Sequence, residues 1–188
     1  MSWLEEAARG IIGSALLLRG QWAQGWFNLT QAGFWRSFGA FLIAAPIYLW
    51  AARLGIPAEA GTAAQKAVVG AVLLKGLLML ALQWISWPLA MVFIARLLKL
   101  SRNYAPYIIA YNWSTVLVLL LQLPPVLLYH FGLVSSNGAA FFMLFALGLV
   151  LYLRWQAARL ALGAPAMLAV ALVLADMTIS LGINRVFM

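Results

Sequence analysis

The chain has 188 residues, of which 66% are hydrophobic and 9% are charged. A soluble domain carries about 25% charged residues because water must solvate its surface. This composition therefore excludes a soluble fold and predicts a membrane protein whose surface is mostly covered by lipid. The formal net charge is +8. Because the basic residues stand singly or in threes at the ends of apolar runs, the charge indicates a membrane-topology signal, and we expect no nucleic-acid partner.

The chain contains no cysteine and one histidine. Disulfides, iron–sulfur clusters, thiol catalysis and haem ligation by two histidines are thereby excluded, and a zinc site would have to be built from few ligands. We expect no metal and no cofactor. The sequence also lacks the serine-hydrolase, zinc-protease, phosphate-binding and dinucleotide-binding patterns, so it predicts no catalytic residues and no enzyme.

Residues 1–33 form the first predicted unit. Apolar residues recur at helical spacing between Trp3 and Leu16, while Ser2, Glu5, Glu6, Arg9 and Ser14 take the other side. The stretch is too polar to span a bilayer, so we expect an amphipathic helix in the headgroup plane. Trp3, Trp22 and Trp26 are the expected interfacial anchors. The connection that follows should end in Asn28 or Thr30 as a helix cap.

Residues 34–188 form the second predicted unit, an all-α bundle of five transmembrane helices. The apolar runs place the spans at about 34–52, 69–95, 105–128, 138–158 and 165–187. Residues 56–66, with Glu59, should form a surface loop. The pair Pro124 and Pro125 should kink or stop the third span, because both lack a backbone donor. The short turn 130–137 makes the third and fourth spans an antiparallel hairpin.

The basic residues give the orientation of the five spans. One side would collect Arg9, Arg19, Arg36, Arg96, Lys99, Arg102, Arg154 and Arg159, and the other Arg53, Lys66, Lys75 and Arg185. Short cytoplasmic loops carry the excess of Lys and Arg. The N-terminus is therefore predicted to be cytoplasmic and the C-terminus to lie on the outer side.

Asp176 is the most informative residue for function, since it lies about eleven residues into the last span, near the bilayer midplane. A carboxylate there costs about 2.5–3.5 kcal/mol, so it should face the bundle, either protonated or with a partner. The candidate partner by charge is Lys75, and the uncharged candidates are Asn112, Gln83, Ser86 and Thr178. Asp176 would act as a proton or cation relay or as a polar packing lock, and the absence of a second intramembrane acid favours the lock. For Lys75 itself, the closeness to the end of the span favours an interfacial anchor that snorkels outward over a functional counter-ion.

A second group of residues follows the second span. Arg96, Lys99, Arg102, Tyr104 and Tyr111 combine positive charge with aromatic rings. The default interpretation is an aromatic belt at the membrane interface, with Tyr111 lying deeper. The functional interpretation is a contact site for lipid headgroups or for a membrane partner.

The last hundred residues resemble a known family. The segments are Arg102-Asn-Tyr104-Ala-Pro-Tyr-Ile-Ile-Ala-Tyr111-Asn-Trp113, Leu123-Pro124-Pro125, Tyr152-x-x-Trp155-x-x-x-Arg159-x-x-Leu162-Gly163, and Asp176. This region is similar to bacterial membrane proteins of the Yip1-like type. The resemblance implies five spans, a cytoplasmic N-terminus and a non-enzymatic role through partners or lipid. The Asp-Leu-Tyr-Gly-Pro-like signature of eukaryotic members is missing, so their trafficking role is not carried over.

Two hypotheses follow. The first is a scaffold or accessory subunit of the bacterial inner membrane, with a periplasmic C-terminus, that binds lipids, other membrane proteins or itself. The second is a small transporter or proton-coupled carrier that uses Asp176. A carrier needs a polar cavity that reaches Asp176, whereas a packing lock needs a direct hydrogen-bond partner and no cavity.

Overall fold

The computed structural model describes residues 2–56 and 62–187, and this part of the chain is helical without any strand. Its helices are α1 (Trp3–Leu18), α2 (Gln31–Ser37), α3 (Phe41–Leu54), α4 (Ala63–Leu97), α5 (Tyr104–His130), α6 (Ser136–Leu160) and α7 (Ala166–Phe187), with single 3-10 turns η1 (Gln24–Trp26), η2 (Phe38–Ala40) and η3 (Ser101–Asn103). Five stretches are long and apolar enough to cross a membrane: Gln31–Leu54, Gln65–Leu97, Ser101–His130, Ser136–Leu160 and Ala166–Phe187. The predicted all-α class with five such helices is confirmed.

The helix ends extend beyond most predicted spans because polar residues also join the helices. α4 begins six residues before the predicted start at 69, since the Thr62 side chain and Gln65 form a capping box. Thr30 caps α2 as expected, with its Oγ1 accepting from the Gly33 N–H at 3.1 Å. α5 does not stop at Pro124 and Pro125 but continues to His130. The predicted loop residue Glu59 lies outside the described residues.

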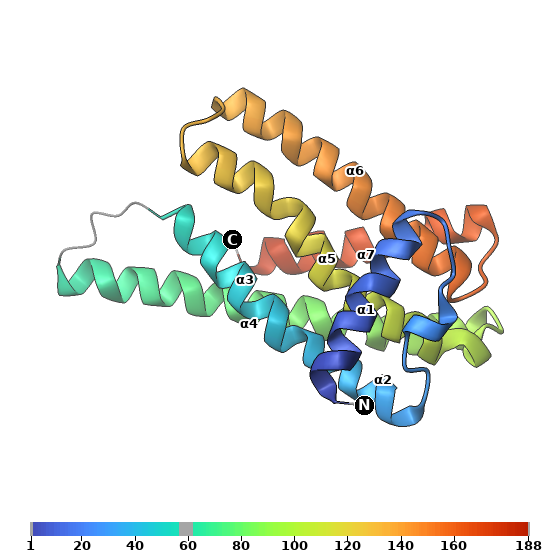
Figure 1. The fold of residues 1–188 in the computed structure, drawn as a ribbon. Coiled ribbons are helices and arrows are strands. Elements are labelled where there is room, and N and C mark those ends of the chain that lie inside the picture. The colour runs from blue at the N-terminus through green and yellow to red at the C-terminus, as the bar shows by residue number, and fades with distance from the viewer. Residues whose placement is uncertain (1, 57–61, 188) are drawn as a thin grey trace.

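Two antiparallel hairpins, α3–α4 and α5–α6, build the bundle, and α5 is its central helix (Figure 1). α5 packs against α1, α2, α3, α4 and α6, whereas α7 packs against α4 and α6. We call the end that contains residues 98–103 and 161–165 the capped end, because α1 and α2 lie there. The turn 131–135 and the facing end of α3 form the hairpin end, where Figure 1 shows the two hairpins diverging with the end of α7 between them.

The packed core lies toward the capped end. The buried residues of α5 include the whole run Tyr107–Ser114, and most of those of α6 fall in its second half. Toward the hairpin end the side chains of Phe141, Leu144 and Phe145 are each more than 60% exposed. Water would solvate such a surface poorly, so it is suited to contact with lipid.

α1 packs closely on α5 and α6 through small residues. Ala7, Gly10 and Gly13 are buried, and a Cβ added to Gly10 would lie 2.5 Å from Cγ of Trp113. The buried face of α1 is not the apolar face that the sequence predicted. Leu4 is 72% exposed, while the polar residues Glu6 and Ser14 are buried. Close approach of two helices requires small side chains at the contact, which turns the larger apolar residues outward. Whether α1 also lies in the headgroup plane stays a prediction.

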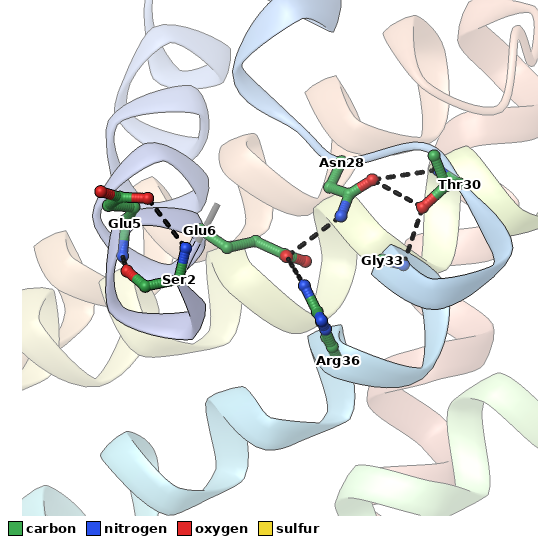
Figure 2. A network of polar contacts seen from close by, with 7 residues as sticks. All are labelled: Ser2, Glu5, Glu6, Asn28, Thr30, Gly33 and Arg36. Carbon is green, nitrogen blue, oxygen red and sulfur yellow. Dashed lines mark hydrogen bonds and ion pairs between the residues drawn. The ribbon is translucent and has the colours of Figure 1, made fainter.

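Glu6 ties α1 to α2 (Figure 2). Its carboxylate is 1% exposed, and its Oε2 accepts a hydrogen bond from Asn28 Nδ2 at 3.0 Å and lies 3.5 Å from Nη1 of Arg36. A buried carboxylate is tolerated only when it is paired and hydrogen-bonded. Arg36 and Asn28 therefore compensate Oε2 of Glu6 and hold α1 against the start of the first apolar span. The buried Oε1 has no hydrogen-bond partner among the described residues.

We expect Gly10→Ala to destabilise the protein by about 1–3 kcal/mol, because the new methyl group would press on the buried Trp113 ring. The measurement is thermal unfolding of the purified protein in detergent. The matched control is Gly148→Ala in α6, where the added Cβ meets nothing within 4 Å. Equal melting temperatures for the two variants would contradict this packing of α1.

Candidate functional site

A cavity of about 360 Å³ lies among the five long helices and contains Asp176. Its lining comes from α3 (Tyr48), α4 (Leu80, Gln83, Trp84), α5 (Tyr111, Thr115, Val118, Leu119, Gln122), α6 (Leu147, Val150, Leu151, Arg154) and α7 (Val173, Asp176, Met177, Ser180, Asn184). On α5 and α7 these residues recur every three or four positions, so each helix offers one face to the cavity. At 1.5 Å per residue, each of these lined faces is about 16 Å long.

Asp176 is partly buried and has a direct partner on another helix. The Tyr111 hydroxyl from α5 lies 3.0 Å from each carboxylate oxygen. One hydroxyl carries one proton, whereas an ionised carboxylate can accept about four hydrogen bonds. Asp176 therefore keeps unused acceptor capacity beside the cavity.

Arg154 is the cation of this cavity, and its exposed fraction is 9%. Its Nη1 donates to the Tyr111 carbonyl and to Ser114 Oγ, each at 3.0 Å, and its Nη2 donates to Thr115 Oγ1 at 2.8 Å. The guanidinium carbon also lies 3.6 Å from the centroid of the Tyr111 ring. α5 thus holds the arginine by three hydrogen bonds and one aromatic face.

Arg154 and Asp176 share the cavity without forming a direct ion pair. In the described part of the chain, the pair within 4.0 Å is that between Arg36 and Glu6. The Tyr111 side chain lies between the two charges, touching the guanidinium with its ring and the carboxylate with its hydroxyl. Two opposite charges that line one cavity are therefore hydrogen-bonded to neutral groups and make no direct contact with each other.

The structure brings together half of the predicted intramembrane polar set. Gln83 lines the cavity and donates to Asn184 Oδ1 at 2.8 Å, which joins α4 to α7. Asn112 does not line it; this residue is 1% exposed and donates to Ser37 Oγ at 3.0 Å. Lys75 is exposed and lies outside the cavity, as an interfacial anchor would. Asn112 and Lys75 are therefore not the direct partners of Asp176, because their helical faces point elsewhere.

The residues predicted to contact lipid or a partner also fall into two groups, one inside the cavity and one outside it. Tyr111 belongs to the cavity, whereas Arg96, Lys99 and Arg102 are exposed at the capped end. Tyr104 donates to the Pro88 carbonyl at 3.1 Å and borders a second hollow of about 410 Å³ with Phe34 and Trp35. A contact with lipid or a partner at these four residues stays a prediction.

The three expected anchors lie around α1. Trp3 is partly buried, with its ring 6.3 Å from that of Trp113. Trp22 stacks on Phe27 at 5.5 Å. Trp26 is 39% exposed and carries the Arg9 guanidinium 5.9 Å from its ring. Trp26 is thus the most exposed aromatic candidate for an interfacial anchor among the three.

Sequence reasoning missed several cavity residues, above all Arg154. That residue was assigned to the membrane interface because it stands near the end of the fourth span. A usable signal existed, since Arg159 already occupies that end and Arg154 lies more than one helical turn further inside. On α7 the spacing of Asp176, Ser180 and Asn184 also places three polar residues on one face. No cluster of metal-ligating side chains occurs among the described residues.

We expect Tyr111→Phe to lower the free energy of unfolding by about 1–2 kcal/mol. Interhelical hydrogen bonds in membranes contribute about 0.6 kcal/mol on average and up to about 1.7, and a charged acceptor should place this bond at the upper end. The measurement is reversible unfolding in mixed micelles, with Tyr129→Phe on the exposed side of α5 as the matched control. In an Asp176→Leu background the change at Tyr111 should cost little, and an undiminished cost there would contradict the assignment.

No protein-family model matches the chain, and no curated protein or solved structure was found to be similar to it. The conclusions about this site therefore rest on its own geometry.

Proposed function

We propose that the protein is a small membrane carrier whose substrate site is the cavity around Asp176. The observation that carries the proposal is the 360 Å³ cavity itself, which holds a carboxylate and a guanidinium inside an apolar bundle. A packing lock accounts for the bond between Tyr111 and Asp176. It does not account for the space beside them or for the cost of keeping two charges at that space.

The arrangement of charges around the cavity fits a binding site better than it fits a proton relay. A relay needs successive titratable groups along a path. The other ionisable residues that line the cavity are Tyr48, Tyr111 and Arg154, and none of them carries a second carboxyl group. Asp176 can therefore bind a substrate cation or exchange one proton, with Arg154 held beside it.

We further propose the bacterial inner membrane as its location, with the N-terminus in the cytoplasm and the C-terminus in the periplasm. The support is the basic capped end, where Arg96, Lys99, Arg102 and Arg159 lie. Because Arg154 is buried, it no longer counts toward this bias, which falls from eight basic residues against four to seven against four. The direction is unchanged.

A scaffold or accessory subunit is the second candidate. It is favoured by the exposed aromatic and aliphatic side chains of α6 at the hairpin end, which a membrane partner, a second copy or lipid could cover. The resemblance to Yip1-like proteins points in the same direction, since it implies action through partners or lipid. This candidate gives no role to the cavity.

Cysteine labelling tests the carrier directly, because the chain has no native cysteine. Ser180 lines the cavity, whereas Thr178, two residues away on α7, is exposed on the outside of the bundle. Thiols react as thiolates in water and not in lipid. We expect Ser180→Cys to react with a membrane-impermeant methanethiosulfonate in both right-side-out and inside-out vesicles, and Thr178→Cys to react in neither.

The orientation of the vesicles separates the alternatives. Labelling of Ser180→Cys from both sides indicates alternating access, as a carrier requires. Labelling from one side alone, or from neither, would contradict the carrier. The folded state of each variant is checked by its elution as a single species in detergent.

A further inference from the structure

We propose that the Asp176 cavity binds a zwitterion: a molecule with an ammonium group and an acid group close together and an apolar substituent. The inference rests on the proposed carrier function and names its substrate class. It depends on one feature, namely that two opposite charges face the same space without pairing with each other.

The carboxylate of Asp176 provides the site for the ammonium group. Both oxygens share the single hydroxyl of Tyr111, and no Lys or Arg nitrogen in the described chain lies within 4.0 Å of them. An ammonium group carries three donors and no acceptor. It would fill the remaining acceptor positions of Asp176 and neutralise its charge.

The guanidinium of Arg154 provides the site for the acid group. Three of its N–H donors are used by Tyr111, Ser114 and Thr115, all of which are neutral acceptors. A guanidinium has five donors in a planar fork that matches a carboxylate or phosphate. Two donors therefore have no partner among the described residues, and no direct ion pair neutralises the positive charge, so an anionic group of the ligand can use both.

Tyr111 sets the spacing between the two charges. Its ring lies against Arg154 and its hydroxyl reaches Asp176, so one phenol contacts both charges while they stay more than 4.0 Å apart. A ligand with one charge would compensate one of them and leave the other exposed to an apolar cavity, which is costly. A ligand with both charges compensates both. This electrostatic difference is the source of the expected selectivity.

The remaining walls fit an apolar substituent. Beyond the charged groups the apolar lining includes Val118 and Leu119 of α5, Leu147 and Leu151 of α6, and Met177 of α7, next to a few uncharged polar residues such as Gln83 and Gln122. Its 360 Å³ is near the lower end of the range of about 300–1,000 Å³ for small-molecule sites. The space therefore suits a hydrophobic amino acid or the headgroup of an ethanolamine phospholipid, and these two sources share the same charges.

Binding measurements on the purified full-length protein test the inference. The free ligands are L-leucine and L-phenylalanine, with N-acetyl-L-leucine as the anion and L-leucinamide as the cation. The lipids are phosphatidylethanolamine and the anionic phosphatidylglycerol, read by native mass spectrometry. We expect at least one zwitterion to bind at least tenfold more tightly than its single-charge counterparts. Whether this preference occurs among the amino acids or among the phospholipids identifies which of the two is the ligand.

Asp176→Asn supplies the decisive variant, because the amide keeps an acceptor for Tyr111 but loses the charge. We expect it to abolish the preference for the zwitterion, while the anionic counterpart binds at least as tightly as before because no uncompensated carboxylate remains beside it. Lys75→Gln, outside the cavity, should keep the preference in full. If no zwitterion binds, if zwitterions and single-charge ligands bind equally, or if Asp176→Asn keeps the preference, the inference is wrong. If Ser180→Cys is still labelled from both sides, any of these results would contradict the zwitterionic ligand class and not the carrier function.

Discussion

The buried guanidinium of Arg154 is the constraint around which the bundle is organised. A charge inside an apolar bundle must be met by hydrogen bonds, because lipid supplies none. Here the acceptors are the carbonyl of Tyr111 and the hydroxyls of Ser114 and Thr115, all within one turn of α5. This requirement fixes the register of α6 on α5. It also orients the Tyr111 phenol, which reaches α7 at Asp176.

The molecule compensates the buried carboxylate of Glu6 and the partly buried carboxylate of Asp176 in different ways. Glu6 meets Arg36 and Asn28 directly, and that contact fastens α1 to α2 at the capped end (Figure 2). Asp176 meets a hydroxyl, although the Arg154 guanidinium lines the same cavity. A direct pair suffices for a structural role. An arrangement in which opposite charges stay apart beside a cavity is suited to a ligand that completes it.

The five apolar helices were predictable because hydrophobic length is a local property of the sequence. The cap at Thr30 was predictable for the same reason, since it depends on contacts within three residues. The role of Arg154 was not, because a basic residue six positions from a helix end can reach the interface or turn inward. The choice depends on acceptors about forty positions earlier in the chain, on α5. Likewise hydrophobic periodicity encodes neither the burial of Glu6 nor the close fit of Gly10 against Trp113.

An experimental structure in lipid nanodiscs, determined by electron cryomicroscopy with a rigid antibody fragment attached, tests the central claim most directly. The account predicts Arg154 held on α5, Asp176 bonded to Tyr111, and density for water or a bound molecule between the two charges. A direct contact of Arg154 with Asp176 within 4.0 Å, with the surrounding helices closed on each other and no cavity, would contradict it.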